Sequence, residues 1–503
     1  MASSRPNVLC ILTDDQGVWA AGCYGNGEIR TPHIDRIAET GVRFDRFFVA
    51  TPVCSPSRAT LLTGRIPSQH GVHDWIKGGN VGEGAASYLD GETTYTDVLA
   101  GHGWRCGLSG KWHLGNSTLP QHGFSHWFTH QFGGGPYNDA PMVRNGLPVT
   151  EPGYVTNVIT DDALAFIDRH ANQDDPFYLS VHYTAPHSPW TGHPQDIVDS
   201  YDDCPFDSCP QEPVHPWAGG LTRECMGDRE SLKGYFAAVT AMDLDVGRLL
   251  DRLDHHGIRE DTLVVFLSDN GFSLGHHGFW GKGNGTSPLN MYENSILVPA
   301  LVSQPGRLPE GAVQPAMISA YDFMPTLLSY LDLPVPWDRN LPGRNAVDAW
   351  MFGVARGDQP ARSARSDQPG GAARDVSSDA DRDEQAASTE ASDAGRDHVV
   401  VFDEYGGTRM IRTESWKYVH RYPDGPNELY NLANDPDERA NLADDAGYAG
   451  RRRSLHGELE DWFERYADPD RDGWSWPVSG AGQLRPVGGA RDDDSPAFEQ
   501  LTS

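Results

Sequence analysis

Short, continuous apolar runs recur along the first 300 residues, and polar or turn-forming residues follow each of them. The runs at residues 7–12, 176–183 and 262–267 predict strands that are buried on both faces, because a strand with one wet face would alternate apolar and polar residues. Residues 42–49 and 296–302 are predicted to add further strands. Between them, apolar positions repeat with helical spacing at 34–41, 96–102, 160–170, 232–253 and 319–331. This alternation predicts an α/β fold with a large mixed, mostly parallel sheet flanked by helices.

The pattern changes after residue 350. Residues 357–397 consist mainly of Ser, Ala, Asp, Arg and Gly, so they cannot bury enough apolar surface to order and are predicted to form a disordered linker or insertion. Strands predicted at 399–402, 408–413 and 416–422, with a helix at 451–466, indicate a small C-terminal α+β domain with an antiparallel sheet. We therefore expect a main α/β domain over 1–350, the disordered segment over 357–397, the C-terminal domain over 398–480 and a flexible tail over 481–503.

Composition adds an unusual charge balance. The formal net charge is −31, and only five of the 40 basic residues are Lys, so the other 35 are Arg. An acidic, Lys-poor surface is typical of proteins that stay soluble in concentrated salt, which leads us to expect a halophilic prokaryotic source. Such a surface repels nucleic acids and anionic membranes, so neither is an expected partner.

Cysteine usage and the N-terminus narrow the class of protein further. Seven Cys in 503 residues do not form a disulfide framework, although Cys204 and Cys209 could either pair or simply pack. Residues 1–14 contain only one short apolar run, which is neither a signal peptide nor a membrane span, so we expect a cytoplasmic protein. Nothing in the sequence indicates an oligomeric state.

Acidic and amide side chains follow two of the predicted buried strands. Asp14 and Asp15 come after the first, and Asp269 and Asn270 come after the strand at 262–267. Each pair alone could be a solvated turn, but the carboxyl ends of parallel strands meet at one edge of a sheet, where ligands bind. A site made only of oxygen donors favours Ca²⁺ or Mg²⁺ over zinc.

Cys54 lies beside the predicted start of a short helix. Ser55 is a favourable N-cap and Pro56 suits the first helical turn, which would place the Cys54 thiol just outside a helix N-terminus that favours anions. Arg58 is placed to turn its guanidinium back towards Cys54. Taken alone, Cys54 is better explained as a buried structural thiol than as a functional group.

Other polar residues stand in extended, Gly-rich or Pro-rich segments. Lys111 and His113 alternate in such a segment and would point the same way. His187 lies between two prolines that keep it out of a helix, and Lys282 ends the loop 275–282. Aromatic residues of the loop 124–137, together with Trp190 and the weaker candidates His73, Asp74 and Trp75, indicate the wall of a sugar-sized pocket.

The twelve residues from Cys54 to Arg65 resemble the signature of the formylglycine-dependent sulfatases, members of the alkaline phosphatase superfamily. The resemblance extends over residues 6–442. It includes Asp14-Asp15, the second signature at 110–115, the histidine motif at 186–189, the metal motif at 268–271, Lys282, and the C-terminal motifs at 428–432 and 434–436.

This resemblance implies an alkaline phosphatase-like fold and a reaction. A sulfatase-maturation enzyme such as the formylglycine-generating enzyme would convert Cys54 to formylglycine, whose hydrate attacks the sulfur of an organic sulfate ester. His113 would deprotonate the second hydroxyl to expel sulfate, Arg58 and Lys111 would neutralise the sulfate, and His187 with Lys282 would bind sulfate and protonate the departing alcohol. One Ca²⁺, with Mg²⁺ as an alternative, would be held by Asp14, Asp15, the modified Cys54, Asp269 and Asn270.

The substrate remains open within this class. A carbohydrate sulfate is favoured over an aryl sulfate, although both fit an aromatic pocket. Because sulfate and phosphate share a tetrahedral shape, a phosphate or phosphonate ester hydrolase on the same scaffold is the first alternative. An inactive protein that binds sulfated glycans and keeps an unmodified Cys54 is the second.

Overall fold

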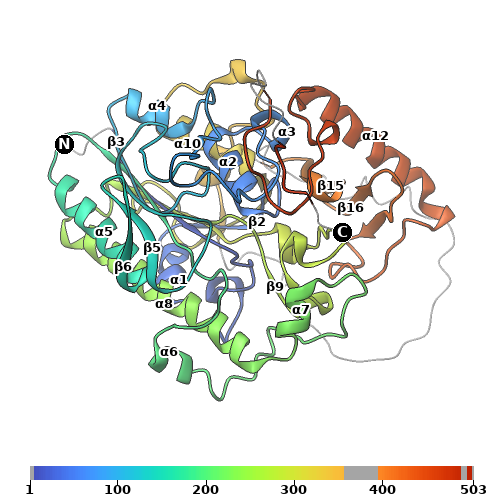
Figure 1. The fold of residues 1–503 in the computed structure, drawn as a ribbon, viewed down its shortest axis with the longest axis horizontal. Coiled ribbons are helices and arrows are strands. Elements are labelled where there is room, and N and C mark those ends of the chain that lie inside the picture. Colours follow the sequence, from blue (N-terminus) through green and yellow to red (C-terminus); the bar gives the residue numbers. More distant parts are fainter. Residues whose placement is uncertain (1–4, 356–394, 489–495, 501–503) are drawn as a thin grey trace.

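The computed structural model describes residues 5–355, 395–488 and 496–500, and it consists of a large α/β unit with a smaller C-terminal unit beside it (Figure 1). Almost all of the segment predicted to be disordered, 357–397, lies outside the described residues. Within them, no helix is both long and apolar enough to cross a bilayer.

The large unit is built on a mixed sheet of eleven strands. In spatial order these are β13 (Val354–Ala355), β12 (Ala312–Ser319), β2 (Val42–Phe48), β11 (Ala300–Ser303), β8 (Thr262–Ser268), β1 (Asn7–Thr13), β7 (Phe177–His182), β3 (Arg105–Lys111), β4 (Phe124–His130), β5 (Asn138–Arg144) and β6 (Leu147–Tyr154). The five central strands, β8 to β4, run parallel. Antiparallel pairs continue the sheet on both sides, except that β2 and β12 pair in parallel. The prediction of a large mixed sheet is confirmed.

Helices cover both faces of this sheet, which explains why the strands β1, β7 and β8 carry mainly apolar residues without alternation. One face packs against α1 (Pro32–Glu39), α5 (Val155–His170) and α8 (Arg229–His255). The other packs against α2 (Cys54–Thr63), α4 (Tyr95–Gly101), α10 (Phe323–Tyr330) and α11 (Val347–Met351). Shorter elements complete the unit: α3 (Pro67–His70), α6 (Gln195–Asp199), α7 (Gly220–Cys225), α9 (Glu293–Ile296), β9 (Ser273–Leu274) and β10 (Trp280–Gly281).

The C-terminal unit is the predicted antiparallel sheet with one long helix. Its strands are β14 (His398–Asp403), β15 (Thr408–Thr413), β16 (Trp416–Arg421) and β17 (Glu428–Asn431), and α12 (Ala449–Tyr466) packs on them. The buried Lys417 of β16 fastens this unit to the large one, because its Nζ lies 2.7 Å from Glu293 Oε1 and 2.5 Å from Glu438 Oε1.

Several local predictions differ from the structure, among them the loop at 124–130, the strand at 296–302 and the tail after Gly480. Residues 124–130, expected to be part of a loop, form β4 at a position where Trp127 and Phe128 are buried in the core. The strand expected at 296–302 begins only at Ala300, because Ile296 ends α9 and residues 297–299 connect that helix to the strand. The tail after Gly480, expected to be flexible, contains the buried side chains Gln483 and Phe498 among its described residues.

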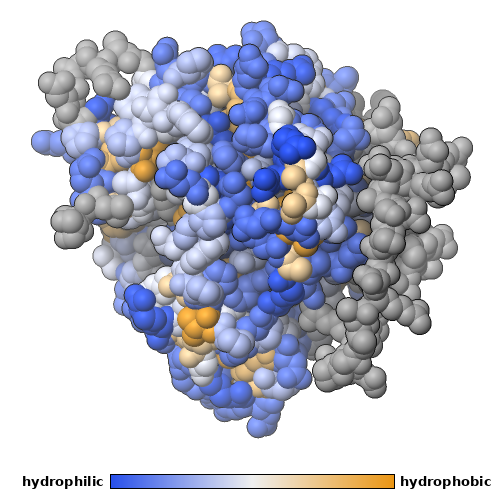
Figure 2. Space-filling model, turned by 90° about the vertical axis from the view of Figure 1, so that its right-hand side faces the viewer, coloured by the Kyte–Doolittle hydropathy of each residue, from blue (hydrophilic) through white to orange (hydrophobic). Residues whose placement is uncertain are grey.

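The surface seen in Figure 2 is mostly hydrophilic, with apolar residues in small, separated groups. All seven cysteines are free, so Cys204 and Cys209 do not pair.

Candidate active site

The acidic residues predicted from the strand ends lie together at the carboxyl edge of the sheet. β1 and β8 pair in parallel with Thr13 opposite Ser268, so the residues that follow each strand become neighbours. The backbone N–H of Asp15 donates to Asp269 Oδ1 over 3.3 Å, and Asn270 Nδ2 donates to Asp15 Oδ1 over 2.6 Å. Burial of these residues is nearly complete.

Each of the three buried carboxylates has its own cationic partner. Lys111 Nζ lies 2.5 Å from Asp14 Oδ2, and Lys282 Nζ lies 2.6 Å from Asp15 Oδ1. Arg58 Nε donates to Asp269 Oδ2 over 2.8 Å. Because a buried charge without a partner is strongly destabilising, these pairs make the cluster possible. They also bring three positively charged groups from three distant segments into one site.

The pKa shifts show how closely the charges balance. Burial opposes ionisation of Asp15, but Lys282 and His187 prevail and hold its pKa below the usual range. Burial and the neighbouring Asp14 raise the pKa of Asp269, against the opposing effect of Arg58 and Lys111. Asp14 and Asp269 therefore repel each other in spite of their partners.

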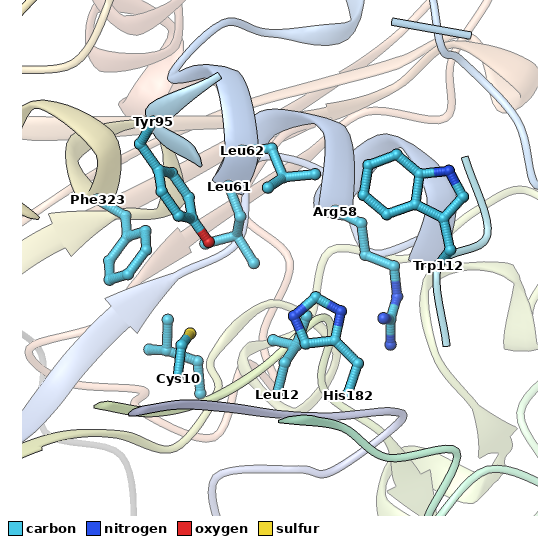
Figure 3. A pocket seen from close by; sticks show the side chains of 10 residues that line it. Cys10, Leu12, Arg58, Leu61, Leu62, Tyr95, Trp112, His182 and Phe323 are labelled. Carbon is cyan, nitrogen blue, oxygen red and sulfur yellow. The ribbon is translucent and has the colours of Figure 1, made fainter. Parts of the chain in front are cut away.

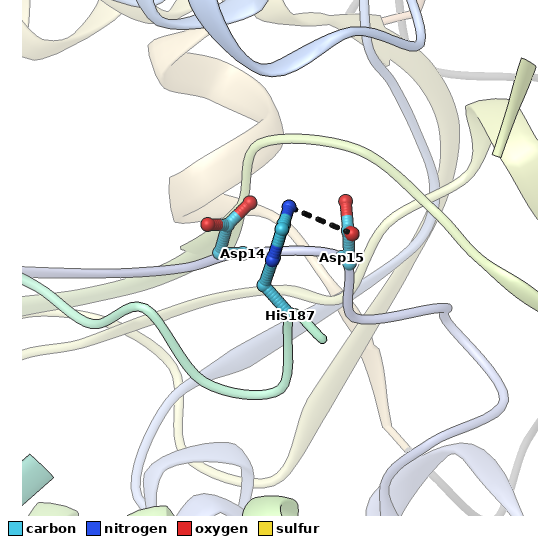
Figure 4. A group of neighbouring side chains, drawn as sticks. All are labelled: Asp14, Asp15 and His187. Atoms are coloured by element: carbon cyan, nitrogen blue, oxygen red, sulfur yellow. Dashed lines mark ion pairs between the residues drawn. The ribbon is translucent and has the colours of Figure 1, made fainter. Parts of the chain in front are cut away.

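A divalent cation fits this cluster. Asp14 Oδ1 is buried and has no hydrogen-bond partner, and the donors predicted from the strand ends are all oxygens. Oxygen atoms of Asp14 and Asp15 and a ring nitrogen of His187 all lie within 4.8 Å of one another. Figure 4 shows the His187 ring between the two carboxylates. Hard oxygen ligands suit Ca²⁺ or Mg²⁺.

Cys54 is the first residue of α2, and its buried Sγ lies 3.4 Å from His113 Nδ1. The helix begins at Cys54 and not at Pro56, so Ser55 is not the N-cap. Its Oγ instead donates to the carbonyl of His113 over 2.9 Å and accepts from the N–H of Ile76 over 3.1 Å. Ser55 therefore fixes the position of His113 relative to Cys54.

His113 faces Cys54 with an unprotonated nitrogen. Its Nε2 lies 3.1 Å from the carbonyl oxygen of Ile76, which can only accept, so Nε2 carries the hydrogen. Burial, together with the nearby Lys111 and Arg58 charges, holds the pKa of His113 well below its usual value. The neutral ring thus presents Nδ1 to Cys54 as an acceptor.

His187 enters the site from the loop after β7. Its Nδ1 lies 2.7 Å from the carbonyl of Ser188, and its Nε2 lies 3.8 Å from Asp15 Oδ2, beyond hydrogen-bond distance. The side chain is 28% exposed, unlike the buried groups around it. Tyr137 anchors this loop through a 2.8 Å hydrogen bond to the His187 carbonyl.

A pocket of about 250 Å³ opens from this cluster to the surface. Its inner end is formed by Asp15, His187 and Lys282. Its outer wall comes from residues 219–221, at the start of α7, and from Asn284 and Gly285. Nothing in the sequence indicated these wall residues, because they meet through contacts between distant segments. Ala218 pairs with Thr286, and the N–H of Gly219 donates to the Gly285 carbonyl over 2.8 Å.

A second cavity lies beneath α2 and is much smaller, at about 10 Å³. Arg58 and Trp112 approach it from one side, while Leu12 and His182 rise from the sheet on the other (Figure 3). It has room for about one water molecule and none for a substrate.

None of the three aromatic residues predicted to wall the pocket lines it, although Trp190 lies directly behind the lining, against Phe272 and Trp280. Trp127, Tyr137 and Trp190 are buried, and their polar atoms donate to backbone carbonyls. The pocket is lined instead by Phe272 and Trp280. The sequence alone does not distinguish aromatic residues that line the pocket from aromatic residues that are buried.

His73, Asp74 and Trp75 lie against the C-terminal segment and not at the lining of this pocket. His73 Nε2 lies 2.6 Å from the Arg471 carbonyl, Asp74 accepts from the N–H of Gly482, and Trp75 Nε1 donates to the Gly480 carbonyl. Their role in substrate binding stays a prediction.

Comparison with known proteins gives the family. The family model described as Sulfatase matches residues 6–333, about two thirds of the chain. The chain belongs to the sulfatase family. Sulfatases hydrolyse sulfuric ester bonds, and the residues predicted from the signature motifs all lie in or beside the cluster described above.

Individual sulfatases align with most of the length of this chain. The N-acetylglucosamine-6-O-sulfatase of Bacteroides thetaiotaomicron is 27% identical over 93% of this chain and 88% of its own length. A solved structure described as a complex with its substrate D-glucosamine-2-N,6-O-disulfate has a TM-score of 0.73 at 24% identity, covering 93% of this chain and 99% of that one. A phosphonate monoester hydrolase of Agrobacterium radiobacter shares the fold at a TM-score of 0.62 and 21% identity, covering 92% and 96% of the two chains.

Proposed function

We propose that this sulfatase hydrolyses a carbohydrate sulfate monoester, using formylglycine formed from Cys54 and one bound Ca²⁺. The observation that carries the proposal is the convergence of a buried thiol, a neutral imidazole and three cationic side chains beside an oxygen-rich cluster. Conversion of Cys54 requires a maturation enzyme, which is therefore the expected protein partner.

The sulfate group would lie between the cationic side chains. Arg58 and Lys111 approach it from α2 and β3, where each is held by a carboxylate and by burial, so little reorganisation is needed as charge develops. The hydrated formylglycine supplies two hydroxyl oxygens on one carbon, and Ca²⁺ held by Asp14, Asp15, Asp269 and Asn270 would polarise one of these and the sulfate.

The alcohol would depart as one hydroxyl oxygen of the hydrated residue 54 bonds to sulfur and the bond between sulfur and the alcohol oxygen breaks. The proton of that hydroxyl would pass to a nearby Asp of the metal site, and the alcohol oxygen needs a proton of its own. His187 is the better placed donor, because its Nε2 lies at the inner end of the pocket and has no hydrogen bond to Asp15. Lys282 is already paired with Asp15 and would mainly neutralise sulfate oxygens.

Release of inorganic sulfate needs a base on the other side of residue 54. His113 Nδ1 is unprotonated and faces that position, so it would accept the proton of the second hydroxyl as sulfate leaves and the aldehyde re-forms. Addition of water then restores the hydrate.

The size of the pocket supports a small leaving group. A volume of about 250 Å³ is below the 300–1,000 Å³ typical of drug-sized sites and suits about one sugar ring. The name of one relative and the substrate in one similar structure both contain a glucosamine 6-O-sulfate, so a hexosamine 6-sulfate is the first substrate to test.

The experiment pairs mass spectrometry with turnover. Protein matured by its maturation enzyme should carry an aldehyde in place of the Cys54 thiol and should hydrolyse a glucosamine 6-sulfate faster than the matching phosphate. Cys54→Ala is the control and should turn over neither. Dominant phosphate or phosphonate turnover would favour the alternative hydrolase, and an intact thiol in protein from the native host would favour a binding protein.

A further inference from the structure

Three consecutive glycines, Gly133 to Gly135, follow β4 and lie against three histidine rings. A Cβ atom placed on Gly133 would lie 2.2 to 2.7 Å from ring atoms of His113. On Gly134 it would lie 3.1 Å from the ring of His187, and on Gly135 3.2 Å from the ring of His130. The first and second of these rings are the two proposed to move protons.

Backbone conformation does not explain these glycines. None of the three has a positive φ, so residues with side chains could adopt the same backbone. The restriction is space, and it is graded along the loop. A Cβ at Gly133 would force its neighbour to move, whereas a Cβ at Gly134 or Gly135 would make only a tight contact.

The His113 ring has little freedom to give way. It is 4% exposed, its Nε2 is held by the Ile76 carbonyl and its Nδ1 faces Cys54. The loop itself is anchored at both ends. His130 Nδ1 lies within 3.1 Å of the backbone nitrogen of Phe132, and Tyr137 donates to the His187 carbonyl.

We infer that Gly133 and Gly134 are positioning residues that hold the two proton-transferring histidines from one loop. Gly133 keeps the His113 ring against Cys54, and Gly134 sets how far the His187 ring reaches over Asp15. This inference rests on the proposed function for the roles of the two histidines. The two glycines affect different steps of the reaction, since Gly133 acts on sulfate release and Gly134 acts on alcohol departure.

The first test uses a stability cycle on protein with unmodified Cys54. Gly133→Ala should lower the unfolding temperature by about 2 °C or more, because the new methyl group meets the His113 ring. In a His113→Ala background the ring is absent, so the same substitution should not lower the unfolding temperature. An equal drop in both backgrounds, or none in either, would overturn the positioning of His113 by Gly133.

The second test separates the two kinetic steps in matured protein. With an aryl sulfate, Gly133→Ala should keep a rapid first release of the phenol and slow later turnover about tenfold or more. Gly134→Ala should slow the first release only slightly with the aryl sulfate, and much more with a sugar sulfate, whose leaving group needs the proton from His187. Gly457→Ala, on α12 with open space around its Cβ position, is the matched control and should behave as wild type.

Two results separate failure of this inference from failure of the proposed function. Equal slowing of both steps in either glycine variant would overturn the inference while sulfatase activity stands. If matured wild-type protein hydrolyses no sulfate ester, the proposed function fails, and the stability cycle still decides whether Gly133 positions the His113 ring.

Discussion

Nδ1 of His113 lies 3.4 Å from Sγ of Cys54, although 59 residues separate them in the chain. Ser55 maintains this arrangement by bonding both the His113 carbonyl and the Ile76 N–H, and Ile76 in turn holds the far side of the imidazole. The nucleophile precursor and its neighbouring base are therefore fixed as one unit at the start of α2.

Replacing His113 by Ala should separate the two halves of the reaction. The alcohol should still leave once per site, but repeated turnover should fall by about 10² or more, the usual contribution of a positioned base. Rapid-mixing measurement of phenol release from an aryl sulfate tests this. Loss of the first release as well would contradict the assigned role.

Replacing His187 by Ala should lower the rate of hydrolysis most for substrates with poor leaving groups. A sugar alkoxide needs a proton in order to leave and a nitrophenolate barely does, so we expect a loss of about 10²–10⁴ on a sugar sulfate and a much smaller one on nitrophenyl sulfate. Lys282→Ala should lower both rates, because it removes a charge that faces sulfate. His126→Ala, whose ring pairs with Asp162, is the control. Equal losses for His187→Ala on both substrates would argue against a proton donor.

Removal of divalent cations should lower both activity and stability. A chelator would leave Asp14 and Asp269 in mutual repulsion, and Ca²⁺ at about 100 times its Kd should restore about 2.7 kcal/mol of unfolding free energy. Thermal unfolding with and without Ca²⁺ measures this. Asp14→Asn should reduce the Ca²⁺-dependent shift, and Asp175→Asn, in an exposed pair with Arg105, should not. An unfolding temperature that is the same with and without Ca²⁺ would exclude the metal site.

Asp243 should make the stability depend on pH. Burial raises its pKa to about 7, although the backbone N–H groups of His33 and Ile34 donate to its carboxyl group at the start of α1. An acid with a raised folded-state pKa contributes stability below its unfolded pKa of 3.8, and this contribution is lost as pH rises through about 7. Between pH 5 and 8 the wild type should lose roughly 2–3 kcal/mol more than Asp243→Asn. Parallel pH profiles of the two proteins would contradict this.

Concentrated salt should stabilise the protein. Four of its five lysines are buried, and Lys77 is the exposed one, so Arg carries nearly all the positive charge of an acidic surface. Raising KCl from about 0.01 M to 1 M shortens the screening length from about 30 Å to about 3 Å and should raise the unfolding temperature. Sucrose at equal osmolality is the control. An equal effect of both solutes, or no effect of salt, would remove the argument for a halophilic protein.

Much of this molecule could be predicted from local pattern. The apolar runs of β1, β7 and β8 placed the centre of the sheet, because a strand covered by helices on both faces has no solvent-facing side that calls for polar residues. The same runs placed Asp14, Asp15, Asp269 and Asn270 at one edge, since parallel strands end together. Motif spacing then indicated Cys54, Arg58, Lys111, His113, His187 and Lys282.

Only the tertiary structure decided which atoms face each other. Arg58 pairs with Asp269 rather than bonding Cys54, and Ser55 bonds a distant loop instead of capping its helix. Trp127 and Trp190 are buried and do not line the pocket. The pocket wall and the glycine contacts at His113 and His187 depend on segments that meet only after folding. The sequence determined the strands, the edge and the chemical groups, because these depend on periodicity and composition. The partners of each group depend on long-range packing, which no local pattern records.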